Sequence, residues 1–265
     1  RPVEVTWTGY GLLDGATNMA QIAGNVRVKY VDSDGSINEA HADRANIELG
    51  VKQAAGKKKE ERKFAFMSDR YAKRLTLLPL AGKDVRLQSL LPGPDGTIAR
   101  QTNILGPRVE IFLDETGVQR LELPASNDHP GRLLYIEMPI ATRKAVQVDD
   151  PFQKRELPGS TAVAWRKMLS YDRATSRMDM TGDIMVRHEP HVRGGRNFLI
   201  NADRIIADMA EKNGADRSSQ ALDVSKLTIL GAPAHLVRND TDLTAPTIEI
   251  DPVTRTVMAR GTQQI

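Results

Sequence analysis

The feature that most constrains the fold of this chain is an internal repeat with a fixed offset. Six residues of the segment 5–24 recur 158 positions later with the same identity and without a gap. The matched pairs are Val5 and Val163, Trp7 and Trp165, Asp14 and Asp172, Ala16 and Ala174, Thr17 and Thr175, and Gly24 and Gly182. The two tryptophans are the only ones in the chain. A repeat of this kind predicts that the same structure is built twice.

The likeness continues along the chain in the same order. Residues 24–29 correspond to 182–187, 42–44 to 202–204, 75–77 to 227–229, and 107–111 to 246–250. The fixed order of these pairs favours duplication over coincidence. We therefore expect a first copy over residues 1–124 and a second copy over residues 161–265. Residues 125–160, which are rich in proline, are expected to join the two copies.

Alternation of apolar and polar residues predicts β-strands within each copy, because successive side chains of a strand point to opposite faces. In the first copy one face carries Ile22, Gly24, Val26, Val28 and Tyr30. In the second copy the same face carries Met178, Met180, Gly182, Ile184 and Val186, and similar alternation surrounds Val109, Ile111, Ile248 and Ile250. Gly, Pro and Asp turn signals separate the runs. The pattern indicates an all-β chain, built as a sandwich, a barrel or an open β-roll.

Three segments are less certain. The spacing of Ala202, Ile205, Ile206 and Met209 also fits an amphipathic helix, but the counterpart at residues 42–49 alternates. Since two copies share one structure, strands are favoured for both. Residues 54–74, with their Lys-rich run, are expected to form a surface loop or a short helix. Residues 132–137 resemble a strand that would carry sheet through the join.

Composition excludes several classes of protein. The 265 residues are 40% hydrophobic and 27% charged, so they can form one large or two smaller globular domains. No run of about 18 apolar residues is present, so no membrane span is expected. A net charge of +3 and 5% aromatic residues give no indication of nucleic-acid binding. The absence of cysteine excludes disulfides and thiol chemistry, and it fits a periplasm or a cytosol equally.

No catalytic or metal-binding motif emerges. His188 and His191 are spaced like zinc ligands, but Pro190 interrupts the helix that such a pair needs, so an exposed loop is favoured. Asp128-His129 has no evident nucleophile beside it, and Gly9-Tyr10-Gly11 lacks the third glycine of a dinucleotide loop. We therefore expect a protein that is not an enzyme and that has no metal and no cofactor. The two tryptophans are expected to be core anchors of their copies.

The order of these motifs resembles the OstA-like repeat family of periplasmic lipopolysaccharide-transport proteins. The second copy resembles it over residues 165–261, through 180–186, 199–204, 230–234, 243–251 and 257–261. The first copy resembles it more loosely over residues 7–123, through 24–28 and 42–44. The resemblance implies tandem β-jellyrolls, each folded like a taco around an apolar groove, stacked end to end in the periplasm.

The resemblance also implies a function. This function is the binding of lipopolysaccharide, or another amphiphilic lipid, and its transfer between inner and outer membrane. The implied partners are other β-jellyroll proteins or further copies of this chain, and contact with membranes would occur only through these partners. The expected groove residues are Ile22, Val26, Val28, Ile47, Met180, Ile184, Val186, Ile205, Ile248 and Ile250. Alternation alone leaves open whether these residues line a groove or fill a closed core. The alternative function is a scaffold that assembles by adding edge strands, and a carbohydrate-processing enzyme ranks third.

Overall fold

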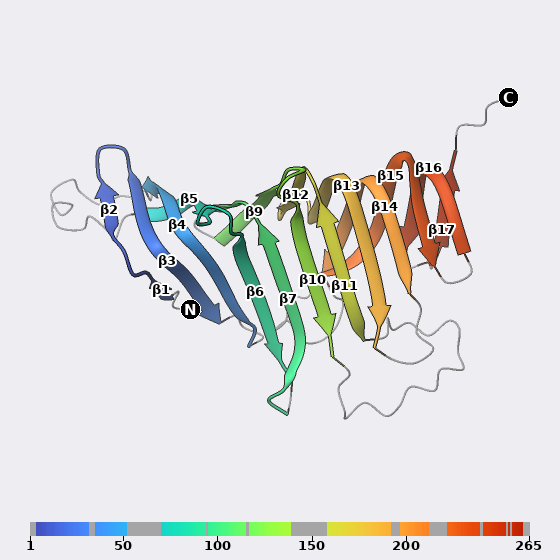
Figure 1. The fold of residues 1–265 in the computed structure, drawn as a ribbon, viewed down its shortest axis with the longest axis horizontal. Coiled ribbons are helices and arrows are strands. Elements are labelled where there is room, and N and C mark those ends of the chain that lie inside the picture. Colours follow the sequence, from blue (N-terminus) through green and yellow to red (C-terminus); the bar gives the residue numbers. More distant parts are fainter. Residues whose placement is uncertain are drawn as a thin grey trace, which may run out of the picture.

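The computed structural model describes residues 4–31, 35–51, 70–93, 95–114, 117–138, 158–191, 197–211, 222–238, 241–252, 254 and 256–261. Every helix or strand within these residues is a β-strand, and the strands form one antiparallel sheet (Figure 1). The predicted all-β class is confirmed. None of the described residues forms a helix that could cross a membrane.

The strands follow the chain in order. The first ten are β1 (Glu4–Thr6), β2 (Gly11–Asp14), β3 (Met19–Val31), β4 (Ile37–Val51), β5 (Arg70–Leu78), β6 (Val85–Pro92), β7 (Ile98–Gly106), β8 (Val109–Asp114), β9 (Gly117–Pro124) and β10 (Gly131–Glu137). The others are β11 (Gly159–Trp165), β12 (Met168–Asp172), β13 (Arg177–Pro190), β14 (Phe198–Glu211), β15 (Leu222–Arg238), β16 (Thr241–Asp251) and β17 (Thr256–Arg260).

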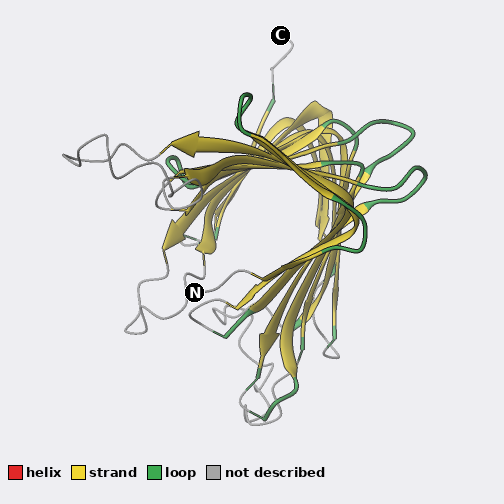
Figure 2. Cartoon of the chain, turned by 90° about the vertical axis from the view of Figure 1, so that its left-hand side faces the viewer, coloured by secondary structure: helices red, strands yellow, loops and turns green. Residues whose placement is uncertain are grey.

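The sheet is folded along its length into two facing walls (Figure 2). The front wall contains β1, β6, β7, β10 and β11, and the back wall contains β2, β5, β8, β9, β12 and β17. The long strands β3, β4, β13, β14, β15 and β16 belong to both walls. Their pairings shift register between the walls, for example between Ala23 and Val26 and between Thr181 and Ile184. Such bulges bend a strand and let one strand serve both walls.

A glycine in the left-handed region stands at the bulge of β3 and of β13. Gly24 has φ 90° and Gly182 has φ 84°, a conformation that side chains with a Cβ rarely adopt. The preceding turn is bonded to each bulge: the Thr8 N–H donates to the Gly24 carbonyl and the Arg166 N–H to the Gly182 carbonyl, both at 2.7 Å. A Cβ on Gly24 would lie 2.6 Å from the backbone nitrogen of Gly9. Both the φ angle and the close approach therefore require glycine.

The strand pairings recur with the offset found in the sequence. Val5 pairs with Val28, and Val163 with Val186; Gly11 pairs with Ile22, and Leu169 with Met180. In the second half the continuous strand β15 pairs with β14, whereas in the first half two separate strands, β5 and β6, pair with β4. In the same way, the continuous strand β16 corresponds to the two strands β7 and β8. The two halves thus share one order of pairing, with two strands interrupted in the first half.

The segments that sequence left uncertain are mostly resolved. Residues 42–49 and 202–209 lie in β4 and β14, so the strand prediction is confirmed and the helix is excluded. Of residues 54–74, those from 70 onward belong to β5, where a loop or helix was expected, and 54–69 lie outside the described residues. The strand β10 pairs with both β7 and β11, so sheet continues through the join.

The two tryptophans lie in unlike surroundings. Trp165 is fully buried, and its indole N–H donates to the Leu123 carbonyl at 3.1 Å. Trp7 is 46% exposed, so the prediction that both anchor the core is wrong for Trp7. The strands β9 and β10 cover Trp165 and its neighbours, whereas no described strand precedes β1 to cover Trp7 in that way. The sequence repeats, but the neighbouring strands do not.

We predict that Gly131→Ala destabilises the protein. A Cβ at Gly131 would lie 2.1 Å from Cε2 of Trp165, and overpacking of a core costs about 1–3 kcal/mol. Gly261→Ala is the control, because a Cβ there meets nothing within 4 Å. Denaturant unfolding followed by tryptophan fluorescence measures both. Equal stability of the two variants would contradict the described contact between β10 and Trp165.

Candidate binding surface

The side chains that point between the walls form rows that cross the strands. The row nearest the bend, here the hinge row, is apolar in both walls and is buried except near the ends of the sheet. In the back wall it contains Gly11, Ile22, Ala45, Leu77, Val109, Leu123, Leu169, Met180, Ile205, Ile229, Ile248 and Ala259. In the front wall it contains Val26, Ala42, Val85, Gly106, Gly131, Trp165, Ile184, Ala202, Ala234 and Ala245.

The next row outward, here the middle row, is also apolar but is mostly only half-buried. In the front wall it contains Val5, Val28, Ala40, Leu87, Ile104, Leu133, Val163, Val186, Ile200, Leu236 and Leu243. In the back wall it contains Leu13, Ala20, Ile47, Leu75, Ile111, Leu121, Tyr171, Met178, Ala207, Leu227, Ile250 and Val257. The two middle rows extend from one end of the sheet to the other.

The third row differs between the walls. In the front wall it is polar or aromatic, and we call it the polar row: Tyr30, Asn38, Ser89, Thr102, Tyr135, Thr161, His188, Phe198, Arg238 and Thr241. Its inward direction follows from Phe198, which packs against the core cluster. In the back wall the corresponding positions of β4, β5, β8, β9, β14 and β15 are apolar, and we call them the apolar rim: Leu49, Ala72, Leu113, Val118, Met209 and Val224. Between Val118 and Met209, the turn that joins β12 to β13 places Arg173 and Ser176 instead.

All ten residues expected from sequence to line an apolar inner face lie in these rows. Six are buried in the core: Val26, Met180, Ile184, Val186, Ile205 and Ile248. Three are partly buried and pack against that core: Ile22, Val28 and Ile250. Ile47 is half-buried in the middle row of the back wall. Neighbours such as Met185 are exposed, so the strand register agrees with the alternation.

Sequence reasoning missed the middle row of the front wall in the central strands. Leu87, Ile104, Leu133 and Val163 lie side by side there through successive pairings of β6, β7, β10 and β11. The available signal was the alternation of residues 85–90, in which Val85 and Leu87 flank Arg86. These four residues connect the inner faces of the two halves.

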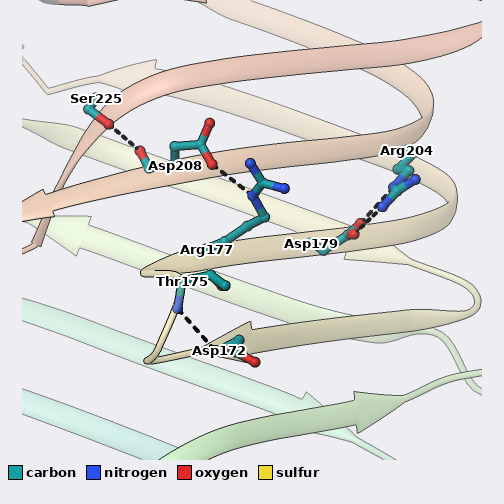
Figure 3. A network of polar contacts seen from close by, with 7 residues as sticks. All are labelled: Asp172, Thr175, Arg177, Asp179, Arg204, Asp208 and Ser225. Carbon is teal, nitrogen blue, oxygen red and sulfur yellow. Dashed lines mark hydrogen bonds and ion pairs between the residues drawn. The ribbon is translucent and has the colours of Figure 1, made fainter.

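The outer face of the back wall is polar, as Figure 3 shows for the second half. The Arg177 Nε donates to Asp208 at 2.8 Å, and the Arg204 Nε donates to Asp179 at 3.0 Å. The hydrogen bond that Arg204 donates to Asp179 raises the pKa of Arg204 above its usual value. Ser225 donates to the Asp208 carbonyl at 2.9 Å. Exposed pairs of this kind contribute little stability, but they set the outer face apart from the apolar inner one.

A cavity of about 310 Å³ lies on the outer face of the first half. Its lining residues are Met19, Asn46, Glu48, Arg74, Thr76, Leu78 and Arg108. Both guanidinium groups form ion pairs with the buried Glu110. Because Glu110 already pairs with both arginines and Glu48 adds a second carboxylate to the lining, the cavity offers no strong site for an outside anion.

Of the two histidines expected in an exposed loop, His191 is exposed just after β13, whereas His188 is placed differently. His188 lies within β13, is half-buried, bonds Thr161 at 2.8 Å through Nδ1 and stacks on Phe198 with ring centroids 4.9 Å apart. His191 bonds the Ser160 hydroxyl at 2.7 Å. The two imidazoles therefore have separate partners. Among the described residues no three acidic or histidine side chains gather as a metal site would require.

We predict opposite effects for neighbouring aspartate substitutions in β13. Ile184 is 2% exposed, so Ile184→Asp buries an unpaired charge and should cost about 4 kcal/mol of unfolding free energy. Met185 is 53% exposed, so Met185→Asp should change stability by no more than about 0.5 kcal/mol. Urea unfolding of both variants measures the contrast. A silent Ile184→Asp would mean that the strand faces the other way.

No family model matches the chain, and no curated protein matches it in sequence. A solved structure with some likeness is LptH from Pseudomonas aeruginosa, described as the LptA homologous periplasmic component of the conserved lipopolysaccharide transport device. It is 12% identical, with a TM-score of 0.27, and the alignment covers 85% of this chain and 82% of that chain. A TM-score of this size does not establish a shared fold, and the strand pairings given above define the architecture.

Proposed function

We propose that the chain binds a lipidic amphiphile between its walls and takes part in moving it between membranes. The observation that supports this proposal is the pair of middle rows, which are apolar along the whole sheet and mostly half-buried. A closed core would bury these residues as completely as Leu77 or Ile229 in the hinge row. Eleven strands at about 4.8 Å spacing give an inner surface roughly 50 Å long.

Burial of hydrocarbon supplies the free energy of binding. Each methylene group that leaves water contributes about 0.8 kcal/mol, so a chain of ten buried methylenes gains roughly 8 kcal/mol before entropy costs. Apart from the Tyr171 hydroxyl, the side chains of the middle rows carry no hydrogen-bonding group, so they offer similar contacts at successive positions. Such a surface suits sliding better than one deep pocket. The proposed function needs no catalytic group and no cofactor.

Lipopolysaccharide is the ligand that we propose, with a periplasmic location and a bridging role between inner and outer membrane. The support is the series of OstA-like motifs over residues 165–261 and 7–123. We also infer two copies, residues 1–124 and 161–265, joined by residues 125–160. The recurrence of Val5–Val28 as Val163–Val186 supports this division. Of the ten inner-face residues expected from sequence, Val28, Ile47, Val186 and Ile250 lie in the middle rows and are part of the proposed lipid surface. The other six lie in the hinge rows beneath it.

We predict that the purified protein binds a fluorescent fatty acid saturably. Val28→Thr and Val163→Thr place a hydroxyl in the half-buried middle row at a cost of about 1 kcal/mol each, so each should weaken binding roughly fivefold. Arg187→Ala, on the exposed outer face of β13, is the control and should bind normally. Circular dichroism confirms that the variants remain folded. Absence of saturable binding by the unmodified protein would overturn the proposed function.

A second function, assembly end to end with further copies or other β-jellyroll proteins, is favoured by the exposed N-terminal end of the sheet. Trp7, Tyr10, Leu12 and Leu13 are 39–60% exposed there. At the corresponding place in the second half, β9 pairs with β12, with Leu123 opposite Leu169. The strand β17 occupies the position of β9 in its own half. A second copy could therefore add β17 to β2, through main-chain hydrogen bonds and apolar contacts.

We predict concentration-dependent association that involves Trp7. Since Trp165 is already buried, a blue shift of tryptophan emission on concentration would come from Trp7. Trp7→Ala should weaken association severalfold in sedimentation, because buried tryptophans are frequent interface anchors. Leu80→Ala, which changes an equally exposed residue away from this end, should not. A strictly monomeric protein at high concentration would exclude self-association and leave other proteins as the candidates.

A further inference from the structure

The two walls present different chemistry at the same distance from the bend. Two residues beyond the middle row, the front wall carries the polar row and the back wall carries the apolar rim. Thr102 of β7 and Leu113 of β8 illustrate the contrast, because these successive strands belong to opposite walls. The contrast extends through both halves, from Asn38 against Leu49 within β4 to Arg238 against Val224 within β15.

The polar row combines hydrogen-bonding groups with aromatic faces. It carries hydroxyl or amide groups on seven strands, and rings from Tyr30, Tyr135 and Phe198. Arg100, just beyond the row, lies 5.8 Å from the Tyr135 ring centroid and has a buried Nε without a hydrogen-bond partner. Arg238, in the row itself, is exposed. Hydroxyls, rings and guanidinium groups together suit an oxygen-rich head group, either phosphate or sugar.

The apolar rim cannot serve a polar head. Val118 and Val224 are 42% and 39% exposed, and neither they nor their neighbours in the rim carry a side-chain donor or acceptor. A head group placed against them would lose water without gaining partners, which costs about 1–3 kcal/mol for each unpaired group. A hydrocarbon chain placed across Ser89 and Thr102 would bury their hydroxyls at a similar cost. Both desolvation penalties favour an arrangement in which the head group avoids the apolar rim and the hydrocarbon avoids the polar row.

We propose that an amphiphile binds in a single orientation, with its head group on the polar row of the front wall and its hydrocarbon toward the hinge rows and the apolar rim of the back wall. This orientation rests on the proposed lipid binding. Because the polar row continues through the join at Tyr135 and Thr161, which pair with each other, the same orientation is kept along the sheet. A ligand that slides from one half to the other keeps its head on the front wall throughout.

Site-directed fluorescence tests the orientation, and the chain suits it because it contains no cysteine. Thr102→Cys and Leu113→Cys each receive a bimane label in the full-length protein. The quenchers are two lysophospholipids of equal chain length, one with a nitroxide on its head group and one with a nitroxide at its chain end. We expect the head-group nitroxide to reduce fluorescence more at residue 102 than at residue 113. The chain-end nitroxide should give the reverse order.

The outcomes separate the two proposals. Quenching that is equal at both residues, or reversed, would overturn the orientation while leaving lipid binding intact. No quenching at either residue, together with no binding of the fluorescent fatty acid, would overturn lipid binding itself. Competition distinguishes the head groups: displacement by dodecyl phosphate but not by dodecyl maltoside assigns the polar row to anionic heads, and the opposite result assigns it to sugars. Displacement by neither amphiphile would overturn the head-group assignment.

Discussion

The bulge that bends each long strand is the constraint on which the rest of the structure depends. At Gly24 and Gly182 the backbone enters the left-handed region, and the preceding turn is hydrogen-bonded to the bend. The register shift lets one strand present apolar side chains inward in both walls. Without the bend, the same alternation would produce one open sheet with a wholly exposed apolar face, which soluble proteins avoid.

The distance of a row from the bend then determines whether its side chains are buried in the core or remain partly exposed between the walls. Near the bend the walls are in contact and the hinge rows form the dry core that holds the fold together. Farther out the middle rows remain apolar but lose part of their cover, and the third rows differ between front and back. Stability and binding are therefore divided along each strand, since residues two positions apart on the same face serve different purposes.

Much of this arrangement could be predicted from sequence, because period-two alternation and the offset of 158 are both local to the chain. The inward direction of Ile184, the outward direction of Met185 and the strand at residues 132–137 follow from such patterns. The exposure of Trp7 could not be predicted, since it depends on which strands lie beside β1 and β2. The polar row was missed for a similar reason: Thr161 and His188 come together through cross-strand register, which a single sequence does not specify.

The central claim is that hydrocarbon enters between the walls along the middle rows. Native mass spectrometry of protein purified from cells without detergent tests it most directly, because retained lipid adds a defined mass that collisional activation releases. The account predicts adducts of amphiphile mass on the unmodified protein and fewer adducts on a double variant with Val28→Thr and Val163→Thr. A bare protein mass under gentle conditions, unchanged after incubation with lipopolysaccharide or lysophospholipid, would contradict it and leave the inner face as a core alone.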